Sequence, residues 1–293
     1  MTFDGKLGQQ AVLNRFRVDN SGINLSRDKV GVEEPLQISL SHQGNSEVFS
    51  LTMRTPGHDT ELVYGLLFSE GVIRHAEDIL RLSTPELKAE LEVEQKGNLI
   101  EAAIDDKVTL DIPKISRRLT SYSGCGLCGK TSLQALELKQ SRAMKPVATL
   151  LSVDLVRELK SLLARQPLFS DTGGVHAAGL VYEKNGCLEI DDSPFFEDVG
   201  RHNALDKLIG FELLQNDLLQ SGILVLSGRI GFELVQKAVM AGFSTIVALG
   251  APSNLAIQAA NQFDMVLVGF AKDKQFNLYT SHRQKVEVGM KSE

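Results

Sequence analysis

Apolar and polar residues alternate in two early stretches of the chain, and this pattern predicts a β-hairpin. Residues 36–40 and 49–53 each carry an apolar side chain at every second position, and the turn-rich segment 41–46 separates them. Apolar residues then recur at helical spacing, which predicts an amphipathic helix from Asp59 to Ser69 that ends near Gly71. The chain therefore begins as a mixture of strands and a helix.

The pattern after this helix is again typical of strands. Residues 91–94 and 99–104 flank a glycine turn and predict a second hairpin, and residues 108–112 predict a third strand. Residues 1–116 are therefore expected to form a smaller α+β domain. The chain then becomes polar and glycine-bearing, which places the predicted domain boundary between residues 116 and 117.

Helices and strands alternate in the second half. Ser152 is a predicted cap of a helix that ends at Leu163, and residues 179–190 predict a hairpin around Asn185 and Gly186. The remaining predicted helices are 198–209, with Asp198 as its cap, 232–240 and 254–261, and the remaining predicted strands are 223–226, 245–249 and 265–268. Because these strands are apolar along their length, we expect residues 117–293 to form an α/β domain with helices on both faces of a sheet.

Composition and charge narrow the class of protein. The chain has 293 residues, of which 43% are hydrophobic and 23% charged, as in globular proteins that fold without disulfides. It contains neither the run of about 20 apolar residues that a membrane span requires nor a recognisable secretory signal, so a cytoplasmic protein is expected. A net charge of −6 gives no support for general nucleic-acid binding.

Two of the three cysteines lie close together in a glycine-rich segment. Cys125 and Cys128 form a Cys-x-x-Cys pair, and Lys130 follows, which favours an accessible thiolate. Three interpretations remain open: sulfur transfer by a thiolate, a zinc site, or a thioredoxin-like dithiol, although no buried strand precedes the pair. Zinc would need two further ligands, for which the candidates are Cys187, His176 and His202.

The same segment matches a phosphate-binding motif by its letters. Residues 124–131 satisfy the P-loop pattern G-x-x-x-x-G-K-[ST], but a P-loop follows an apolar strand, and residues 117–122 are polar. No downstream apolar strand ends in the aspartate that would hold magnesium. A nucleotide hydrolase is therefore disfavoured.

Several turns of the second half carry groups that can bind a ligand. The glycines of residues 172–176 would let the backbone approach a ligand, although a tight turn with a core or surface histidine is the favoured interpretation of this motif alone. Residues 201–203 (Arg-His-Asn) could recognise an anion, against simple capping by Asp198 and solvated charge. Residues 227–229 (Ser-Gly-Arg) follow an apolar strand at the end where α/β sheets bind ligands, and residues 251–254 end the next strand in the same way.

The segment after the last predicted strand is locally basic. This segment contains Lys272 and Lys274 but one acidic residue, Asp273, and Arg283 and Lys285 follow. The local positive charge suits a phosphate or pyrophosphate rather than a long nucleic acid, and a solvated tail is the alternative interpretation.

Taken together, these segments resemble the FdhD family, the formate dehydrogenase accessory proteins that act as sulfur carriers. The motifs that carry the resemblance, in family order, are Arg54-Thr-Pro-Gly, Leu67-Phe-Ser-Glu-Gly71, Cys125-Gly-Leu-Cys128-Gly, Thr172-Gly-Gly-x-His176, Glu197-Asp-Val-Gly-Arg-His-Asn-Ala-Leu-Asp-Lys207 and Ser227-Gly-Arg229.

The resemblance implies a sulfurtransferase-type carrier of a cysteine persulfide. Such a protein takes sulfur from a cysteine desulfurase as a cysteine persulfide and passes it to the molybdenum cofactor, bis-molybdopterin guanine dinucleotide, for formate dehydrogenase. Cys125 would carry the persulfide, with Cys128 assisting. The predicted cofactor-binding residues are Phe270, Ala271, Lys272, Asp273, Lys274, Gln275, Arg229, His176, Arg201 and His202.

The resemblance has two further consequences. The family loop carries arginines where this chain has Lys272 and Lys274, and a lysine cannot make the planar bidentate contact of an arginine. The second domain is expected to resemble the cytidine-deaminase-like fold, without deamination, because Ala177 and Ala178 follow His176 where the deaminase signature needs a glutamate. The alternative function is a metal-binding or scaffolding protein that recruits desulfurase and dehydrogenase without carrying sulfur. A homodimer is the commonest oligomer and the default expectation.

Overall fold

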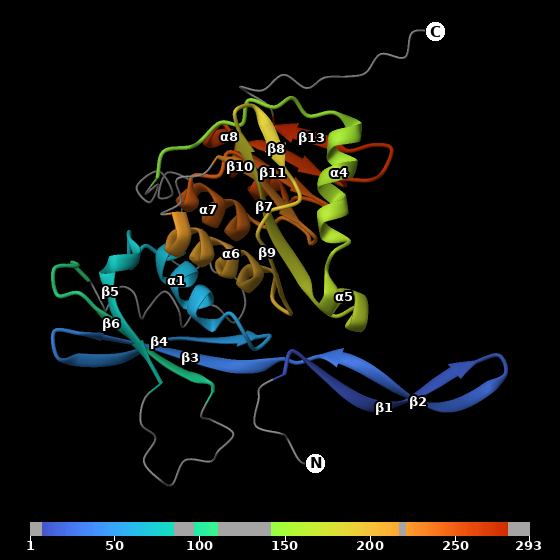
Figure 1. Cartoon of the computed structure of the whole chain (residues 1–293), viewed down its shortest axis with the longest axis horizontal. Coiled ribbons are helices and arrows are strands. Elements are labelled where there is room, and N and C mark those ends of the chain that lie inside the picture. Colours follow the sequence, from blue (N-terminus) through green and yellow to red (C-terminus); the bar gives the residue numbers. More distant parts are fainter. Residues whose placement is uncertain (1–7, 85–96, 111–141, 217–220, 281–293) are drawn as a thin grey trace.

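The computed structural model describes residues 8–84, 97–110, 142–216 and 221–280, and the structural statements that follow concern these residues. They form a two-stranded ribbon, a four-stranded sheet and a seven-stranded sheet. Helices α1, α6 and α7 lie between the two larger sheets (Figure 1). The predicted α/β class is confirmed, whereas the predicted domain boundary at residue 116 lies outside the described residues.

The strands and helices have the following bounds. The ribbon consists of β1 (Gln10–Asp19) and β2 (Gly22–Gly31). The four-stranded sheet has the order β4 (Asn45–Arg54), β3 (Glu34–His42), β6 (Leu99–Ile104) and β5 (Ile79–Ser83). The larger sheet has the order β13 (Asn277–Thr280), β12 (Val266–Gly269), β11 (Thr245–Ala248), β10 (Gly222–Leu226), β7 (His176–Lys184) and β8 (Cys187–Glu189), and β9 (Phe195–Asp198) pairs with β7. The helices are α1 (Asp59–Ser69), α4 (Val153–Leu163), α5 (Pro167–Thr172), α6 (Arg201–Asn216), α7 (Phe232–Ala241) and α8 (Asn254–Gln262), with a 3-10 turn, η1, at Ala76–Asp78.

The first predicted hairpin and helix are confirmed. Strands β3 and β4 pair antiparallel, and Leu36, Ile38 and Leu40 point into the core because alternate residues of a strand share a face. Helix α1 has the predicted bounds, and Gly71 follows it with φ of 72°, a left-handed conformation that favours glycine.

The rest of the first half differs from the prediction. Strand β6 pairs with β5 on one side and with β3 on the other, so both of its edges are occupied. The third strand predicted at residues 108–112 is wrong where it is described, since residues 108–110 form no strand and pack their apolar side chains against the core. The strand predicted at residues 91–94 lies outside the described residues.

The alternation predicted for the second half is confirmed. Ser152 accepts a hydrogen bond from the amide of Leu155 at the start of α4, and Asn185 and Gly186 form the left-handed turn between β7 and β8. Strands β10, β11 and β12 run parallel. Alternate residues of β10 face opposite cores, one formed with α4 and the other with α6, α7 and α8. Among the described residues, no helix is both long and apolar enough to span a membrane.

One buried core joins the two halves of the chain. Helix α1 packs on α6 at two glycines, and a Cβ atom at Gly65 would lie 1.8 Å from the carbonyl oxygen of Asp206. A Cβ atom at Gly210 would lie equally close, 1.8 Å, to the carbonyl oxygen of Glu61. The two helix backbones therefore touch, and no side chain larger than hydrogen fits at either position.

Candidate functional site

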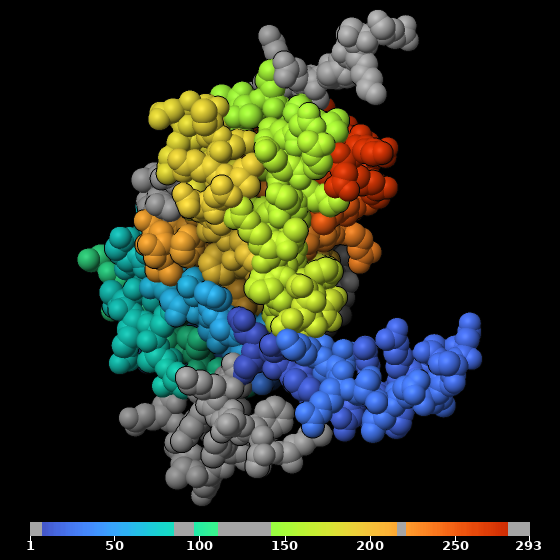
Figure 2. Space-filling view, turned by 45° about the vertical axis from the view of Figure 1, so that its right-hand side comes forward, coloured from blue at the N-terminus to red at the C-terminus, as the bar shows by residue number. Residues whose placement is uncertain are grey.

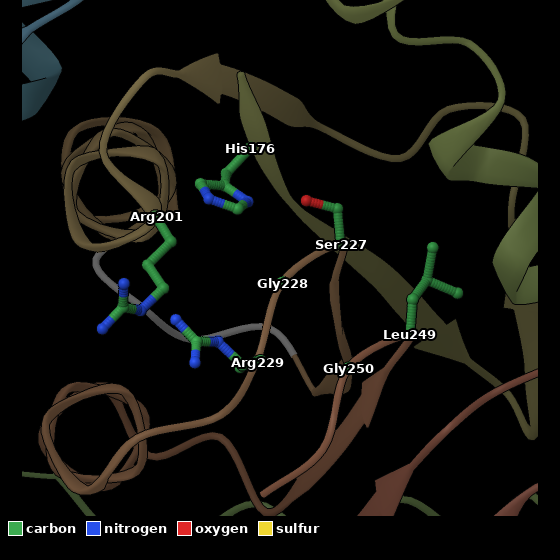
Figure 3. Close-up of a pocket in the computed structure, with 7 residues that line it drawn as sticks. All are labelled: His176, Arg201, Ser227, Gly228, Arg229, Leu249 and Gly250. Atoms are coloured by element: carbon green, nitrogen blue, oxygen red, sulfur yellow. The ribbon is translucent and has the colours of Figure 1, made fainter. Parts of the chain in front are cut away.

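A cavity of about 250 Å³ opens at the carboxyl ends of β10 and β11 (Figure 3). It is lined by His176, Arg201, Ser227, Gly228, Arg229, Leu249 and Gly250. Strand β7 contributes its first residue because it runs antiparallel to β10, which brings its start to the end of β10. Helix α6 contributes its first residue, and the other five belong to the turns after β10 and β11. This is the sheet edge at which α/β folds bind ligands.

Two guanidinium groups give the cavity its charge. Arg201 and Arg229 both extend their side chains toward it (Figure 3). In the described part of the chain, no carboxylate forms an ion pair with either of them, and Nε of Arg201 is buried without a hydrogen-bond partner. Buried polar groups are normally satisfied, so these donors favour an anion in the cavity.

Main-chain hydrogen bonds hold the two turns together. The amide of Ala177 donates to Oγ of Ser227 (2.8 Å), and the amide of Gly250 donates to the carbonyl of Gly228 (3.2 Å). A Cβ atom at Gly250 would lie 2.6 Å from the amide nitrogen of Arg229, so glycine is required there. The amides of Gly228 and Arg229 donate to no acceptor among the described residues. Main-chain amides of such turns can donate to a bound anion.

His176 is neutral at physiological pH. Burial lowers the pKa of its imidazole, and the positive charges of Arg201 and Arg229 lower it further. An anion in the cavity would cancel part of this repulsion and raise the pKa again. His176 therefore reports on the occupancy of the cavity.

This coupling predicts that anion affinity increases as pH falls. The pKa of His176 is depressed without an anion and higher with one, so binding takes up a proton at pH values between the two. We expect sulfate, which does not titrate in this range, to bind more tightly at about pH 5 than at about pH 8. Calorimetric titration of the full chain measures this, and His176→Gln should remove the pH dependence. Equal affinity at both pH values would contradict the assignment.

His202 lies next to this cavity without lining it. Its Nε2 lies 3.1 Å from Oε2 of Glu233 on α7. Burial, followed by the charges of Lys237, Arg201 and His176, lowers the pKa of His202 to about 3. The neutral ring thus joins α6 to α7 and is not part of the cavity lining.

The other polar residues at the start of α6 have structural partners. Asp198 and Lys207 are fully buried, form a 2.7 Å ion pair, and bind the backbone of Thr55. Asp198 ends β9 and accepts from the amide of Gly200, so the prediction that it caps a helix ending at residue 209 is wrong: α6 begins at Arg201 and continues to Asn216. Of the predicted anion cluster, only Arg201 lines the cavity.

The predicted cofactor segment, residues 270–275, adjoins the cavity at one end only. The amide of Phe270 donates to the carbonyl of Gly250 (3.1 Å), and Ala271 is buried. Lys272, Lys274 and Gln275 are exposed and do not line the cavity. Asp273 pairs with Lys160 of α4 at 2.7 Å. The basic side chains of this segment are therefore separate from the arginine pair.

The predicted sulfur site, Cys125 and Cys128, lies outside the described residues. Cys187 is exposed on β8 opposite Lys184, the last residue of β7. His176 is the first residue of that nine-residue strand, so about 26 Å of strand separates the two. Cys187 and His176 therefore cannot be ligands of the same zinc ion.

Sequence reasoning overlooked two residues of the cavity. Leu249 and Gly250 follow β11 directly and contribute to the lining, whereas the sequence pointed to residues 251–254 just beyond them. A glycine directly after an apolar strand was the available signal, because it often marks a close backbone approach.

A family model, several relatives by sequence and a solved structure resemble this chain over most of its length. The model of the FdhD/NarQ family matches residues 31–286. The sulfur carrier protein FdhD of Corynebacterium efficiens is 38% identical over 263 residues, which cover 88% of this chain and 91% of that protein. That of Sulfolobus acidocaldarius is 37% identical over 267 residues, covering 90% of this chain and 93% of that protein. A crystal structure from Desulfotalea psychrophila, described as a formate dehydrogenase accessory protein, has a TM-score of 0.65 and 23% identity, and the match covers 94% of this chain and 98% of that one.

Proposed function

The chain belongs to the FdhD/NarQ family, and from this premise we propose that it is a sulfur carrier that serves the maturation of a formate dehydrogenase. Relatives that are 36–38% identical over most of its length bear the name sulfur carrier protein. The cavity formed by His176, Arg201 and Arg229 is the observation that extends the proposal to the sulfur acceptor.

The proposed loading step uses Cys125. Its thiolate attacks the terminal sulfur of a persulfide on the active cysteine of a cysteine desulfurase. The sulfur–sulfur bond of the donor breaks, the donor cysteine leaves as a thiolate, and Cys125 becomes the persulfide. Cys128 is close enough in sequence to assist this exchange. No external oxidant is needed, because the transferred sulfur atom keeps its oxidation state: one persulfide and one thiolate become another persulfide and another thiolate.

The proposed acceptor is the molybdenum cofactor that carries guanine dinucleotides, bound as a substrate. Two guanidinium groups and two main-chain amides, none of which has a partner among the described residues, suit a diphosphate, whose oxygens accept charge-assisted hydrogen bonds. At about 250 Å³, the cavity is smaller than the sites that enclose a whole drug-sized ligand. It would enclose the phosphates of one dinucleotide and leave the remainder on the surface.

The residues of this chain then have separate tasks. Arg201 and Arg229 orient the phosphates, and His176 adjusts the charge of the cavity by taking up a proton. The contact between the imidazole of His202 and the carboxylate of Glu233 links the start of α6 to α7. Release of sulfur restores the Cys125 thiolate and transfers a sulfur atom in the zero oxidation state, so the two electrons that convert it to sulfide come from the reduced metal of the acceptor. We also propose that the larger sheet is the cytidine-deaminase-like layer of the fold, without deaminase activity.

If the cavity binds the phosphates, removing its two arginines should lower the affinity for a guanine nucleotide. Arg201→Ala combined with Arg229→Ala should weaken binding of GDP to the full chain by about a hundredfold or more, because each arginine supplies charged hydrogen bonds of about 1.5–3 kcal/mol. Isothermal titration calorimetry measures the affinity. The control variant is Arg157→Ala with Arg165→Ala, which removes the same amount of charge. Arg157 lies on α4 and Arg165 just after it, and both form exposed ion pairs, so GDP binding should be unchanged.

A second double variant distinguishes this cavity from the neighbouring basic segment. Lys272→Ala with Lys274→Ala should weaken GDP binding less than the arginine pair does, because both lysines lie outside the cavity lining. Loss of binding in the lysine variant alone would move the phosphate site to residues 270–275. Unchanged binding in the arginine variant would contradict the cavity as the phosphate site.

A further inference from the structure

A buried polar residue follows strand β4 at the contact between the two halves of the chain. Figure 2 shows the first half, in blue and cyan, packed directly against the second half, in yellow and orange. Thr55 directly follows Arg54, the last residue of β4, and belongs to the Arg54-Thr-Pro-Gly motif. It is fully buried and does not line the cavity. Buried polar groups are normally hydrogen-bonded, so the partners of Thr55 indicate what it holds in place.

Three polar atoms of Thr55 bind the segment that leads into helix α6. Its amide donates to Oδ2 of Asp198 (3.1 Å), and its carbonyl accepts from Nζ of Lys207 (2.9 Å). Its hydroxyl oxygen, Oγ1, accepts from the amide of Val199 (3.0 Å). Thr55 is therefore bonded to the last residue of β9, to the turn before α6 and to α6 itself.

The same strand also holds the first turn of α6. Oγ1 of Thr52 donates to Oδ1 of Asn203 (3.1 Å), and Nδ2 of Asn203 donates to the carbonyl of Met53 (2.7 Å). Asn203 is buried. Both ends of its amide group are thus bonded to β4, and the first turn of α6 cannot rotate relative to β4 without breaking hydrogen bonds that are shielded from water.

Arg201 lies between these fixed points. It is the first residue of α6, two positions after Val199 and two before Asn203. From there its side chain extends toward the cavity, with Nε buried (Figure 3). The guanidinium group lies several bonds from the helix backbone, so a small rotation of the first turn of α6 displaces it by more than the backbone moves. A displacement of about 1 Å is enough to weaken a contact that depends on geometry.

The hydroxyl of Thr55 can be removed without taking a partner from the buried charges nearby. Asp198 and Lys207 contact only the backbone of Thr55, and they pair with each other at 2.7 Å. Oδ1 of Asp198 also accepts from the amide of Gly200 (2.8 Å). Substitution of the Thr55 side chain therefore acts on the turn at Val199 and leaves the ion pair intact.

We propose that Thr55 is a positioning residue of the cavity, whose hydroxyl fixes the turn before α6 so that Arg201 points at the bound anion. This inference rests on the proposed function of the cavity as a phosphate site. It gives the Arg54-Thr-Pro-Gly motif a task at that site. The first half of the chain contributes to the site through these hydrogen bonds, without a side chain that touches the ligand.

The test measures the affinity of the full chain for GDP by isothermal titration calorimetry. Thr55→Val keeps the shape of the side chain and removes the acceptor of the Val199 amide, so it should weaken binding about tenfold. Thr55→Ser keeps the oxygen and should bind within about twofold of the wild-type chain. Thr245→Val is the matched control, because Thr245 is fully buried on β11 and its Oγ1 has no hydrogen-bond partner in the described part of the chain. This control should leave binding unchanged.

Combination with the arginine variants separates positioning from general destabilisation. If Thr55 acts through Arg201, Thr55→Val should cost no further affinity in a chain that carries Arg201→Ala, and it should still cost about tenfold beside Arg229→Ala. Losses of equal size in the two backgrounds would overturn the proposal. Unchanged binding in Thr55→Val, or a serine variant as weak as the valine variant, would also overturn it.

Thr52→Val repeats the test with a milder change, in case Thr55→Val does not fold. It removes one hydrogen bond of Asn203, so binding should weaken about threefold, and this loss should again vanish beside Arg201→Ala. Circular dichroism verifies that each variant is folded. A wild-type chain that does not bind GDP would contradict the proposed function of the cavity, and this inference with it. Wild-type binding that both valine variants leave unchanged would contradict the positioning role alone.

Discussion

Replacing Gly210 by alanine is expected to destabilise the chain by about 3 kcal/mol or more, a large fraction of the stability of a typical domain. The added methyl group would lie 1.8 Å from the carbonyl oxygen of Glu61, where no rearrangement of a side chain can relieve the overlap. Helices α1 and α6 would have to separate, and buried contacts between the two halves of the chain would be lost. Chemical denaturation of the full chain measures the change.

The sign of this effect distinguishes packing from helix propensity. Glycine to alanine within a helix normally stabilises a protein by up to about 1 kcal/mol. Gly65→Ala should destabilise like Gly210→Ala, because its Cβ atom meets Asp206 equally closely. Gly174→Ala, in the turn between α5 and β7, is a control for the substitution without overlap, since its Cβ atom would approach Thr172 no closer than 3.9 Å. A neutral or stabilising effect at Gly210 would contradict the helix contact.

Replacing Cys125 by serine is expected to abolish sulfur transfer and leave the fold intact. A serine hydroxyl remains protonated at neutral pH and forms no persulfide, so the loading step has no nucleophile. A strain that depends on this protein for formate dehydrogenase activity should lose that activity completely when it carries Cys125→Ser. The unfolding midpoint of the purified variant should match that of the wild-type chain.

Cys187 provides the control for this experiment. It is a free, exposed cysteine on β8, and it lies at the far end of β7 from the cavity. Cys187→Ser should therefore support full activity. Normal formate dehydrogenase activity with Cys125→Ser would reject the carrier function and favour the scaffolding alternative, in which the protein recruits its partners without holding sulfur.

The elements that the sequence predicted well are those buried within the chain. Strands β10, β11 and β12 are apolar along their length because helices cover both faces of their sheet. The ribbon was missed for the opposite reason, because its apolar side chains at Phe16 and Val18 are exposed and no other part of the described chain covers them. Its alternation is visible only after the partner strand is known. The glycine contact of α1 and α6 was missed because Gly65 fits a helical pattern without revealing its neighbour.

The site was predictable in parts but not as a whole. Arg201 and Arg229 each drew attention from their local motifs. Their meeting with His176 depends on the antiparallel pairing of β7 with β10, which residue periodicity does not reveal. The same topology separates Lys272 and Lys274 from the cavity, although sequence and family resemblance grouped them with it. Motifs in the sequence therefore identified the candidate side chains, and the order of the strands determines which of them line the same cavity.

The central claim, that this chain carries sulfur on Cys125, is tested most directly by mass spectrometry. The full chain is incubated with a cysteine desulfurase and cysteine, and its intact mass and peptides are measured before and after treatment with a reductant. The account predicts an added mass of one sulfur atom that maps to Cys125 and disappears on reduction. Absence of the adduct from Cys125, or its presence only on Cys187, would contradict the account.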